Sequence, residues 1–256
     1  MKEKIKVYIG YDSRQDATPL YNEFKNSPYK VCKKSIKIHN PNIKVKPIKL
    51  NKLVKKNIYK REVDTLASTE FTYSRFLVPH LVGYEGFAMF VDSDFLFLDN
   101  ITKLWDQIIL DKVNWAFTSA WCVQHPEYTP KSDIKFHNKP QLTFPKKNWS
   151  SLMIFNCQHP DCKKLTPITV SNQSPQWLHR FEWTMDNTIG NIPTNWNFLV
   201  GEYEHQTSLP HALHFTNGGP FNDVWGQDYE EFWLMYKEKL NSLAELDEPQ
   251  SPTSIR

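Results

Sequence analysis

The sequence has no long apolar run and no leader-like start. No run in the 256 residues approaches the 18 or more consecutive apolar residues of a membrane-spanning helix. Met1 to Lys6 leads straight into a strand pattern rather than into the apolar region of a signal peptide. We therefore expect a soluble, cytoplasmic protein without a stable membrane span.

Cysteine is scarce. The four residues of this type are Cys32, Cys122, Cys157 and Cys162, and their spacing matches no disulfide framework, so we expect free thiols. His159 lies close to the last two, but a structural zinc site needs a fourth ligand and tighter pairing. The sequence therefore favours neither a disulfide scaffold nor a zinc site.

Net charge is small, at +3, but it is unevenly distributed. Residues 1–62 hold 17 of the 31 Lys and Arg and only 5 of the 28 Asp and Glu. Such a basic region could attract a phosphorylated ligand, a nucleic acid or an anionic membrane, or it could consist of solvated surface lysines. No nucleic-acid-binding motif accompanies it, so a nucleic-acid partner is not expected.

The composition is that of a globular protein. Hydrophobic residues make up 40% of the chain and aromatic residues 14%. This length suits one large domain or two small ones. We assign residues 1–246 to a single domain and expect residues 247–256 to form a disordered tail.

The most informative stretch is residues 87–98, where an apolar run stops twice for a carboxylate. Its first part, Phe87 to Val91, predicts a buried strand of a parallel sheet. Asp92 and Asp94 follow, and residues two apart on a strand share a face at roughly 6 to 7 Å, so one cation could bridge them. Open α/β sheets bind ligands beyond the carboxyl ends of their strands. A polar turn or a helix cap is the alternative.

Strand and helix patterns alternate along the rest of the chain. Strands are predicted over residues 5–10, 43–50, 113–119, 151–155 and 212–216, and helices over 69–77, 100–109 and 228–246. A further helical segment before residue 39 is interrupted by Pro28. Residues 51–61 are predicted to be a mobile surface loop, and residues 121–148 a long loop of the kind tied to function or disorder.

Several polar residues follow the predicted strands. Tyr11 could stack on a ring and Asp12 could accept hydrogen bonds from a base or ribose, although a simple turn explains both. Arg75 falls beside an apolar helical stripe, so its guanidinium could point inward at an anion or outward to solvent. Asn156 ends another strand.

Further candidates lie in the second half. Asp186 and Asn197 stand among aromatic residues, where they could hold a sugar or be ordinary loop residues. His214 lies on a predicted buried strand, where a lone histidine is more often a core residue than a ligand. The glycines Gly218 and Gly219 just after it would let backbone N–H groups approach an anion, and imidazole is an acceptable Mn²⁺ ligand beside two carboxylates.

Five segments follow one another along the chain: Gly10-Tyr11-Asp12, Thr72-Tyr73-Ser74-Arg75, Phe90-Val91-Asp92-Ser93-Asp94, Asn156 and His214-Phe215-Thr216-Asn217-Gly218-Gly219-Pro220. In order and spacing they resemble family 8 glycosyltransferases, relatives of glycogenin and of bacterial galactosyltransferases, from about Ile5 to Trp225. The resemblance implies an α/β protein of GT-A type, with a Rossmann-like, mostly parallel central sheet flanked by helices. It also implies Mn²⁺ or Mg²⁺, a nucleotide-sugar donor, usually a UDP-sugar, and transfer with retention at the anomeric carbon.

The resemblance also assigns roles by position. The donor-binding residues would be Gly10, Tyr11, Asp12, Arg75, Ser93, Gly218 and Gly219, the metal ligands Asp92, Asp94 and His214, and the catalytic residues Arg75, Asn156 and Asp186. The acceptor would be a glycan, a lipid-linked sugar or a protein.

The chain departs from the family pattern twice. No lysine follows His214 within residues 218–222, and Asp186-Asn187 stands where many members have an Asp-Gln or Gln-Asp pair. Two other interpretations stay open: a nucleotidyltransferase or other nucleotide-binding enzyme, and a non-catalytic protein that binds carbohydrate or nucleic acid.

Overall fold

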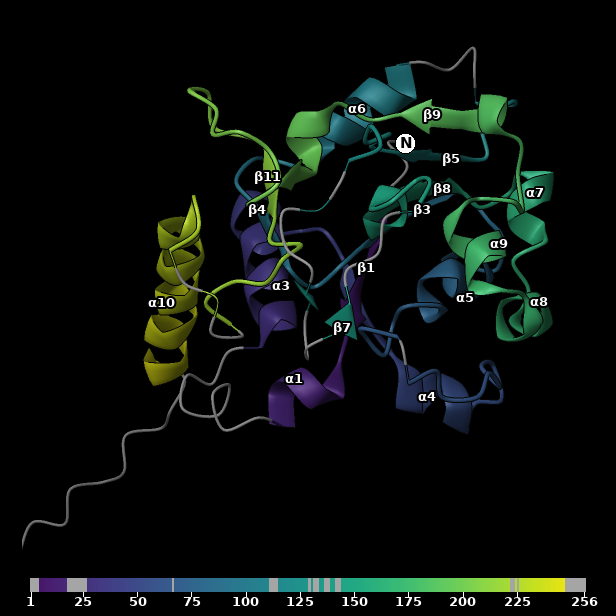
Figure 1. Cartoon of the computed structure of the whole chain (residues 1–256), viewed down its shortest axis with the longest axis horizontal. Helices are drawn as coiled ribbons and strands as arrows, with labels where there is room; N and C mark the ends of the chain where they lie inside the picture. The colour runs from purple at the N-terminus through teal and green to yellow at the C-terminus, as the bar shows by residue number, and fades with distance from the viewer. Residues whose placement is uncertain are drawn as a thin grey trace, which may run out of the picture.

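A six-stranded sheet forms the centre of the molecule (Figure 1). The computed structural model describes residues 5–17, 27–65, 67–110, 115–128, 130, 134–135, 139–140, 144–221, 224 and 226–246. In spatial order the strands are β2 (Val45–Lys49), β1 (Lys6–Tyr11), β3 (Phe87–Val91), β8 (Leu152–Asn156), β5 (Ala120–Cys122) and β9 (Ile189–Asn191). Three of the five pairings are parallel, and β8 runs antiparallel to both of its neighbours. The predicted α/β fold with a mostly parallel sheet is confirmed.

Helices cover both faces of this sheet, which is why the central strand has no polar residue. All five residues of β3 are buried. Phe87, Met89 and Val91 face a core shared with α3 (Pro28–His39) and α6 (Thr102–Leu110). Ala88 and Phe90 face the opposite core. Its covering elements are α4 (Leu50–Lys55), η1 (Ser74–Leu77), α5 (Val78–Leu81), α7 (Pro160–Lys163), α8 (Pro167–Asn172) and α9 (Pro175–His179).

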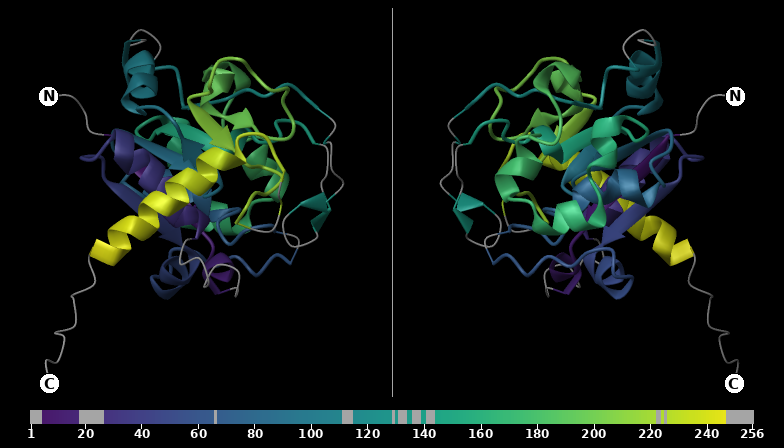
Figure 2. Two further views of the ribbon diagram at one scale, coloured as in Figure 1. Left: turned by 90° about the vertical axis from the view of Figure 1, so that its left-hand side faces the viewer. Right: turned by 90° about the vertical axis from the view of Figure 1, so that its right-hand side faces the viewer.

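A second, smaller sheet lies beside the first. Its strands, in spatial order, are β10 (Phe198–Leu199), β11 (Ala212–His214) and β4 (Phe95–Phe97). The long helix α10 (Glu230–Leu246) buries Trp233 in a third core with Phe215 of the segment after β11. Figures 1 and 2 show α10 alongside α3, and Tyr236 Oη lies 2.9 Å from His39 Nε2 across that contact.

The remaining elements are short. They are α1 (Ser13–Ala17), β6 (Ile134–Lys135), β7 (Lys139–Pro140), η3 (Trp149–Ser151), η4 (Asp186–Thr188) and η5 (Thr194–Trp196). None of the helices within the described residues is both long enough and apolar enough to cross a membrane. All four cysteines are buried and free. The predicted tail at residues 247–256 lies outside the described residues.

Three predicted elements were wrong. Residues 70–73 form turns rather than a helix, and the chain then enters η1 and α5, where Pro79 occupies the first helical turn that proline tolerates. The expected loop at residues 51–61 begins with helix α4, which buries Leu53. Of the strand predicted over residues 113–119, the first two residues lie outside the described residues, and residues 115–117 form a turn before strand β5. The expected long loop from residue 121 therefore opens within a strand, and it also contains β6 and β7.

Candidate metal centre

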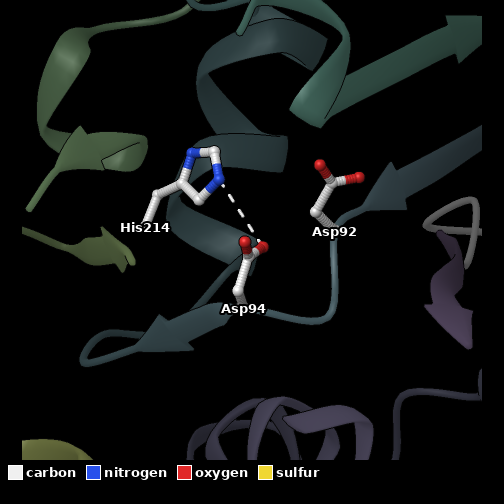
Figure 3. A group of neighbouring side chains, drawn as sticks. All are labelled: Asp92, Asp94 and His214. Carbon is white, nitrogen blue, oxygen red and sulfur yellow. Dashed lines mark ion pairs between the residues drawn. The ribbon is translucent and has the colours of Figure 1, made fainter. Parts of the chain in front are cut away.

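Three side chains converge where the two sheets meet. The main chain leaves the central sheet at the end of β3, passes through Asp92 and Asp94, and enters β4 of the smaller sheet. Strand β11 pairs antiparallel with β4, which sets His214 opposite Phe95. Figure 3 shows Asp92, Asp94 and His214 projecting into the same space.

The geometry of this cluster fits a divalent cation. One ligand atom from each of Asp92, Asp94 and His214 can be chosen so that all lie within 4.8 Å of one another. Asp94 and His214 are 8% and 2% exposed, and His214 Nε2 lies 3.5 Å from Asp94 Oδ1. Among the described residues, Oδ1 of Asp94 is buried without a hydrogen-bond donor, and Oδ1 of Asp92 contacts only the guanidinium of Arg75, without the geometry of a hydrogen bond. Two carboxylates and one imidazole form a donor set that Mn²⁺ accepts readily.

Arg75 is paired with one of these carboxylates. Its Nη1 lies 2.8 Å from Asp92 Oδ1, while its hydrogen bonds run to Asp92 Oδ2 at 3.2 Å and to the carbonyl of Ser150 at 2.9 Å. Burial raises the pKa of Asp92 above its ordinary value, and the guanidinium of Arg75 opposes that rise. The guanidinium of Arg75 therefore points inward at an anion, which was one of the two possibilities raised from the sequence. That anion is the carboxylate of Asp92 in the same chain.

The imidazole of His214 is fixed on two sides. It stacks on the ring of Phe95, with centroids 4.4 Å apart and planes inclined by 21°. Its Nδ1 lies 2.9 Å from Oδ1 of Asn197, which is completely buried. In this structure Asn197 is therefore enclosed and contacts the histidine, and the sugar contact raised from the sequence stays a prediction.

A small pocket opens at the cluster. It contains five of the predicted site residues, namely Arg75, Asp92, Ser93, Asp94 and His214. Its other lining residues, which the sequence did not single out, are Gln15, Ser68, Thr69, Phe71, Asn148 and Thr216. The pocket thus joins the end of β3 to the turns before η1 and to the segment after β11.

The residues at the end of β1 do not line this pocket. Asp12 is 2% exposed and accepts hydrogen bonds from Nε and Nη2 of Arg14, at 2.9 and 2.6 Å, and from the N–H of Glu70 at 3.2 Å. Tyr11 packs edge-on against Tyr29, and Nζ of Lys49 lies 4.1 Å from its ring centroid. In this structure Asp12 therefore ties the β1–α1 turn to residue 70 instead of facing a ligand.

Glycines assigned to the donor have packing roles. A Cβ built on Gly10 would lie 2.5 Å from the ring of Phe71, so the absence of a side chain lets that ring lie against β1. Gly218 has φ of 101°, and its N–H donates to the carbonyl of Phe215. Gly219 packs against Phe215 and Phe221. The N–H of Gly218 is therefore already bonded within the turn.

Two predicted catalytic residues lie away from the pocket. Because β8 is antiparallel to β3, Asn156 pairs with Phe87, at the end of the sheet opposite Asp92, and its amide donates to the carbonyls of Trp115 and Thr118. Asp186 begins η4, just before β9, and is not among the residues that line the pocket. Its side chain is 77% exposed and forms an ion pair with Lys146 at 2.5 Å.

Comparison with known proteins assigns the chain to a family. No family model matches the chain. Protein CDI of Arabidopsis thaliana is 42% identical over 246 residues, which cover 94% of this chain and 88% of that protein. The chain belongs to the family of Protein CDI. That name states no reaction, so the activity of this CDI-family chain must be argued from its site.

Solved structures define the fold of the CDI-family chain. The bifunctional glycosyltransferase WbbM aligns with a TM-score of 0.57 at 11% identity, and GlyE of Streptococcus pneumoniae TIGR4 with 0.54 at 16%. An active-site mutant of LgtC aligns with 0.52 at 10%, over 92% of this chain and 96% of that one. The alignment with WbbM covers 93% of this chain but only 50% of the WbbM chain. The alignment with GlyE covers 98% of this chain and 66% of the GlyE chain. These similarities show the GT-A fold.

The CDI-family site includes residues that sequence patterns missed. Asn148 and Thr216 line the pocket and are linked to each other, with Asn148 Nδ2 3.3 Å from Thr216 Oγ1. Thr216 carries a weak signal, because it lies two residues after His214 at the end of a strand. Asn148 carries none, since its place depends on the direction of β8 and on its left-handed backbone, with φ of 63°.

Proposed function

We propose that the chain is a metal-dependent glycosyltransferase of the family 8 type. It would transfer a sugar from a nucleotide-sugar, most simply a UDP-sugar, to a glycan, lipid-linked or protein acceptor, with retention of anomeric configuration. The observation that carries the proposal is the convergence of Asp92, Asp94 and His214 at the carboxyl end of β3, in a chain with the GT-A fold. Ligands of open α/β sheets bind at such an edge.

The charges of the pocket support a role for the metal. Asp92, Asp94 and Arg75 together leave one negative charge, which attracts a divalent cation and repels a free diphosphate. Asp92, Asp94 and His214 would hold Mn²⁺ or Mg²⁺, which neutralises the charge that develops on a nucleoside diphosphate leaving group. Because no lysine follows His214 in residues 218–222, we expect donor binding to depend strongly on the ion.

If the configuration is retained, the lining of the pocket favours attack on the same face of the sugar over a covalent intermediate on the protein. The pocket walls within the described residues carry two carboxylates, Asp92 and Asp94, and both are assigned to the ion. No third carboxylate lines the described part of the pocket to serve as a nucleophile. The anomeric configuration of the product, read by NMR, tests this part of the proposal.

Ligand-dependent stability tests the proposal directly. We expect UDP to raise the melting temperature with Mn²⁺ present and to have little effect in excess EDTA, since ligands stabilise only the state that binds them. Asp94→Asn should abolish the shift. Asp99→Asn is the matched control, because Asp99 is a neighbouring carboxylate engaged with Lys103 and His211. Equal UDP affinity with and without the ion would contradict the proposal.

A panel of nucleotide-sugars with Mn²⁺ then identifies the donor by release of the nucleoside diphosphate. A nucleotidyltransferase would instead consume a nucleoside triphosphate and release pyrophosphate. A non-catalytic nucleic-acid-binding protein would retain nucleic acid at high salt and show neither reaction.

A further inference from the structure

A line of buried hydrogen bonds leads from His214 to a backbone carbonyl. His214 Nδ1 lies 2.9 Å from Asn197 Oδ1, and Asn197 Nδ2 lies 2.9 Å from Ser151 Oγ. Ser151 Oγ in turn lies 2.6 Å from the carbonyl oxygen of Asn148. The side chains of this line are almost completely enclosed: Asn197, Ser151 and His214 are 0%, 2% and 2% exposed.

The terminal carbonyl sets the direction of every bond in this line. A carbonyl only accepts, so Ser151 must donate its single proton to Asn148, because two oxygens 2.6 Å apart need a proton between them. Ser151 Oγ then accepts from the amide NH₂ of Asn197. The amide oxygen is thereby turned toward His214, where it can only accept.

This direction determines the protonation of His214. Its Nδ1 must carry a proton in order to donate to Asn197, and a neutral imidazole has only one N–H. Nε2 is therefore left with a lone pair, on the side of the ring that faces Asp94.

We propose that Asn197 and Ser151 are positioning residues that hold His214 as the Nδ1–H tautomer, so that Nε2 is available as a ligand in the candidate metal centre. The ion itself rests on the proposed function. The tautomer is a property of the metal-free protein and is tested without metal.

The line of hydrogen bonds acts against a competing interaction. Nε2 lies 3.5 Å from Oδ1 of Asp94, and a carboxylate at that position favours a proton on Nε2. The opposite tautomer would point an N–H at Asp94. That interaction would occupy both Nε2 of His214 and Oδ1 of Asp94, which are candidate ligand atoms. Asn197 and Ser151 prevent this, as the hydrogen-bonding partners of metal-bound histidines generally do by fixing the ring and its tautomer.

The NMR spectrum of ¹⁵N-labelled histidine in the metal-free protein tests the proposal, at a pH where histidine is neutral. We expect His214 to show Nδ1 protonated and Nε2 unprotonated. In Asn197→Leu the proton should move to Nε2, because Asp94 becomes the remaining partner. Titration with Mn²⁺ alone should then show an affinity lower by about 10- to 100-fold, the usual loss when such a partner is removed.

Two neighbouring serines provide a matched pair of variants. Ser151→Ala removes the group that orients Asn197 without touching the bond to His214, so the two tautomers of His214 should become mixed. Ser150→Ala makes the same substitution one residue earlier, where the hydroxyl lies 2.9 Å from Nδ1 of His179. It should alter the His179 resonances and leave both those of His214 and the Mn²⁺ affinity unchanged.

The outcomes separate this proposal from the proposed function. A wild-type His214 protonated on Nε2, or an Asn197→Leu variant that keeps Nδ1–H, overturns the positioning role, and the wild-type measurement does not depend on any variant folding. An Nδ1–H tautomer that depends on Asn197 in a protein that binds no Mn²⁺ supports the positioning role and removes the metal-dependent function.

Discussion

Arg75 and Asp92 form a largely buried ion pair beside the candidate metal centre, with side chains 7% and 15% exposed. Replacing the arginine leaves a carboxylate enclosed without its partner. We predict that Arg75→Ala lowers the free energy of unfolding by about 3 kcal/mol, the lower end of the range for breaking a buried pair. Urea denaturation measures this. Arg75→Lys keeps the charge and should lose less, whereas wild-type stability in Arg75→Ala would show that the pair contributes nothing.

His125 gives the fold a dependence on pH. It is buried, with Nδ1 2.5 Å from Tyr203 Oη, and burial, aided by the nearby His214, lowers its pKa to about 3. An unfolded histidine titrates near pH 6.5, so between about pH 3 and 6.5 the unfolded chain binds the extra proton. Stability therefore falls as pH decreases through that window, by up to about 1.4 kcal/mol per pH unit from this residue.

Urea denaturation at about pH 7.5 and about pH 5 measures this slope. His125→Asn can place a polar atom where Nδ1 lies in the wild type, beside the hydroxyl of Tyr203. Its free energy of unfolding should depend less on pH than that of the wild type. His205→Asn changes an exposed histidine and should keep the wild-type slope. Equal slopes in the wild type and His125→Asn would contradict the prediction.

At the scale of elements, β1 lies closely against the turn that precedes η1. The ring of Phe71 occupies the space that a side chain at Gly10 would need. We predict that Gly10→Ala costs about 1 to 3 kcal/mol by overpacking. Phe71→Leu in the same chain should recover part of this loss, and thermal melts of the two single variants and the double variant test it. Purely additive losses would contradict a shared space.

Strand direction limited what the sequence could predict about the site. The apolar run Phe87 to Val91 was sufficient to locate the end of a buried strand and the two aspartates after it. The same reasoning correctly placed Asn156 at a strand end. The sequence does not reveal that β8 runs antiparallel to β3, which puts the carboxyl end of β8 at the edge of the sheet opposite Asp92. The segment before β8, which includes Asn148 and Ser151, reaches the site instead.

Pairing between strands far apart in the chain was a second limit on what the sequence could predict about the site. His214 lies on a short strand whose neighbour, β4, is more than a hundred residues earlier in the chain, and periodicity cannot reveal that contact. The family resemblance suggested His214 as a ligand, whereas its own pattern suggested a core residue. The roles assigned to Asp12 and Gly10 stay predictions, because a strand-end position alone does not distinguish packing from binding.

At the scale of the whole molecule, the candidate metal centre bridges two sheets. Asp92 follows the central sheet, whereas His214 belongs to the smaller one, supported by α10. We predict that Mn²⁺ slows amide hydrogen exchange in β4 and β11 more than in β2, since binding stabilises the structure that holds the ligands. Asp94→Asn should remove the difference. A uniform change across the chain would argue against a bridging site.

An ion held between these sheets would also close a loop of about 120 residues, from Asp92 to His214, and closing a loop of that size limits the freedom of the opened chain. The two sheets could not then separate without releasing the ion. In a cell, the supply of metal would set how long each copy of the protein survives proteolysis as well as how fast it works, so metal starvation should reduce its abundance before its synthesis changes.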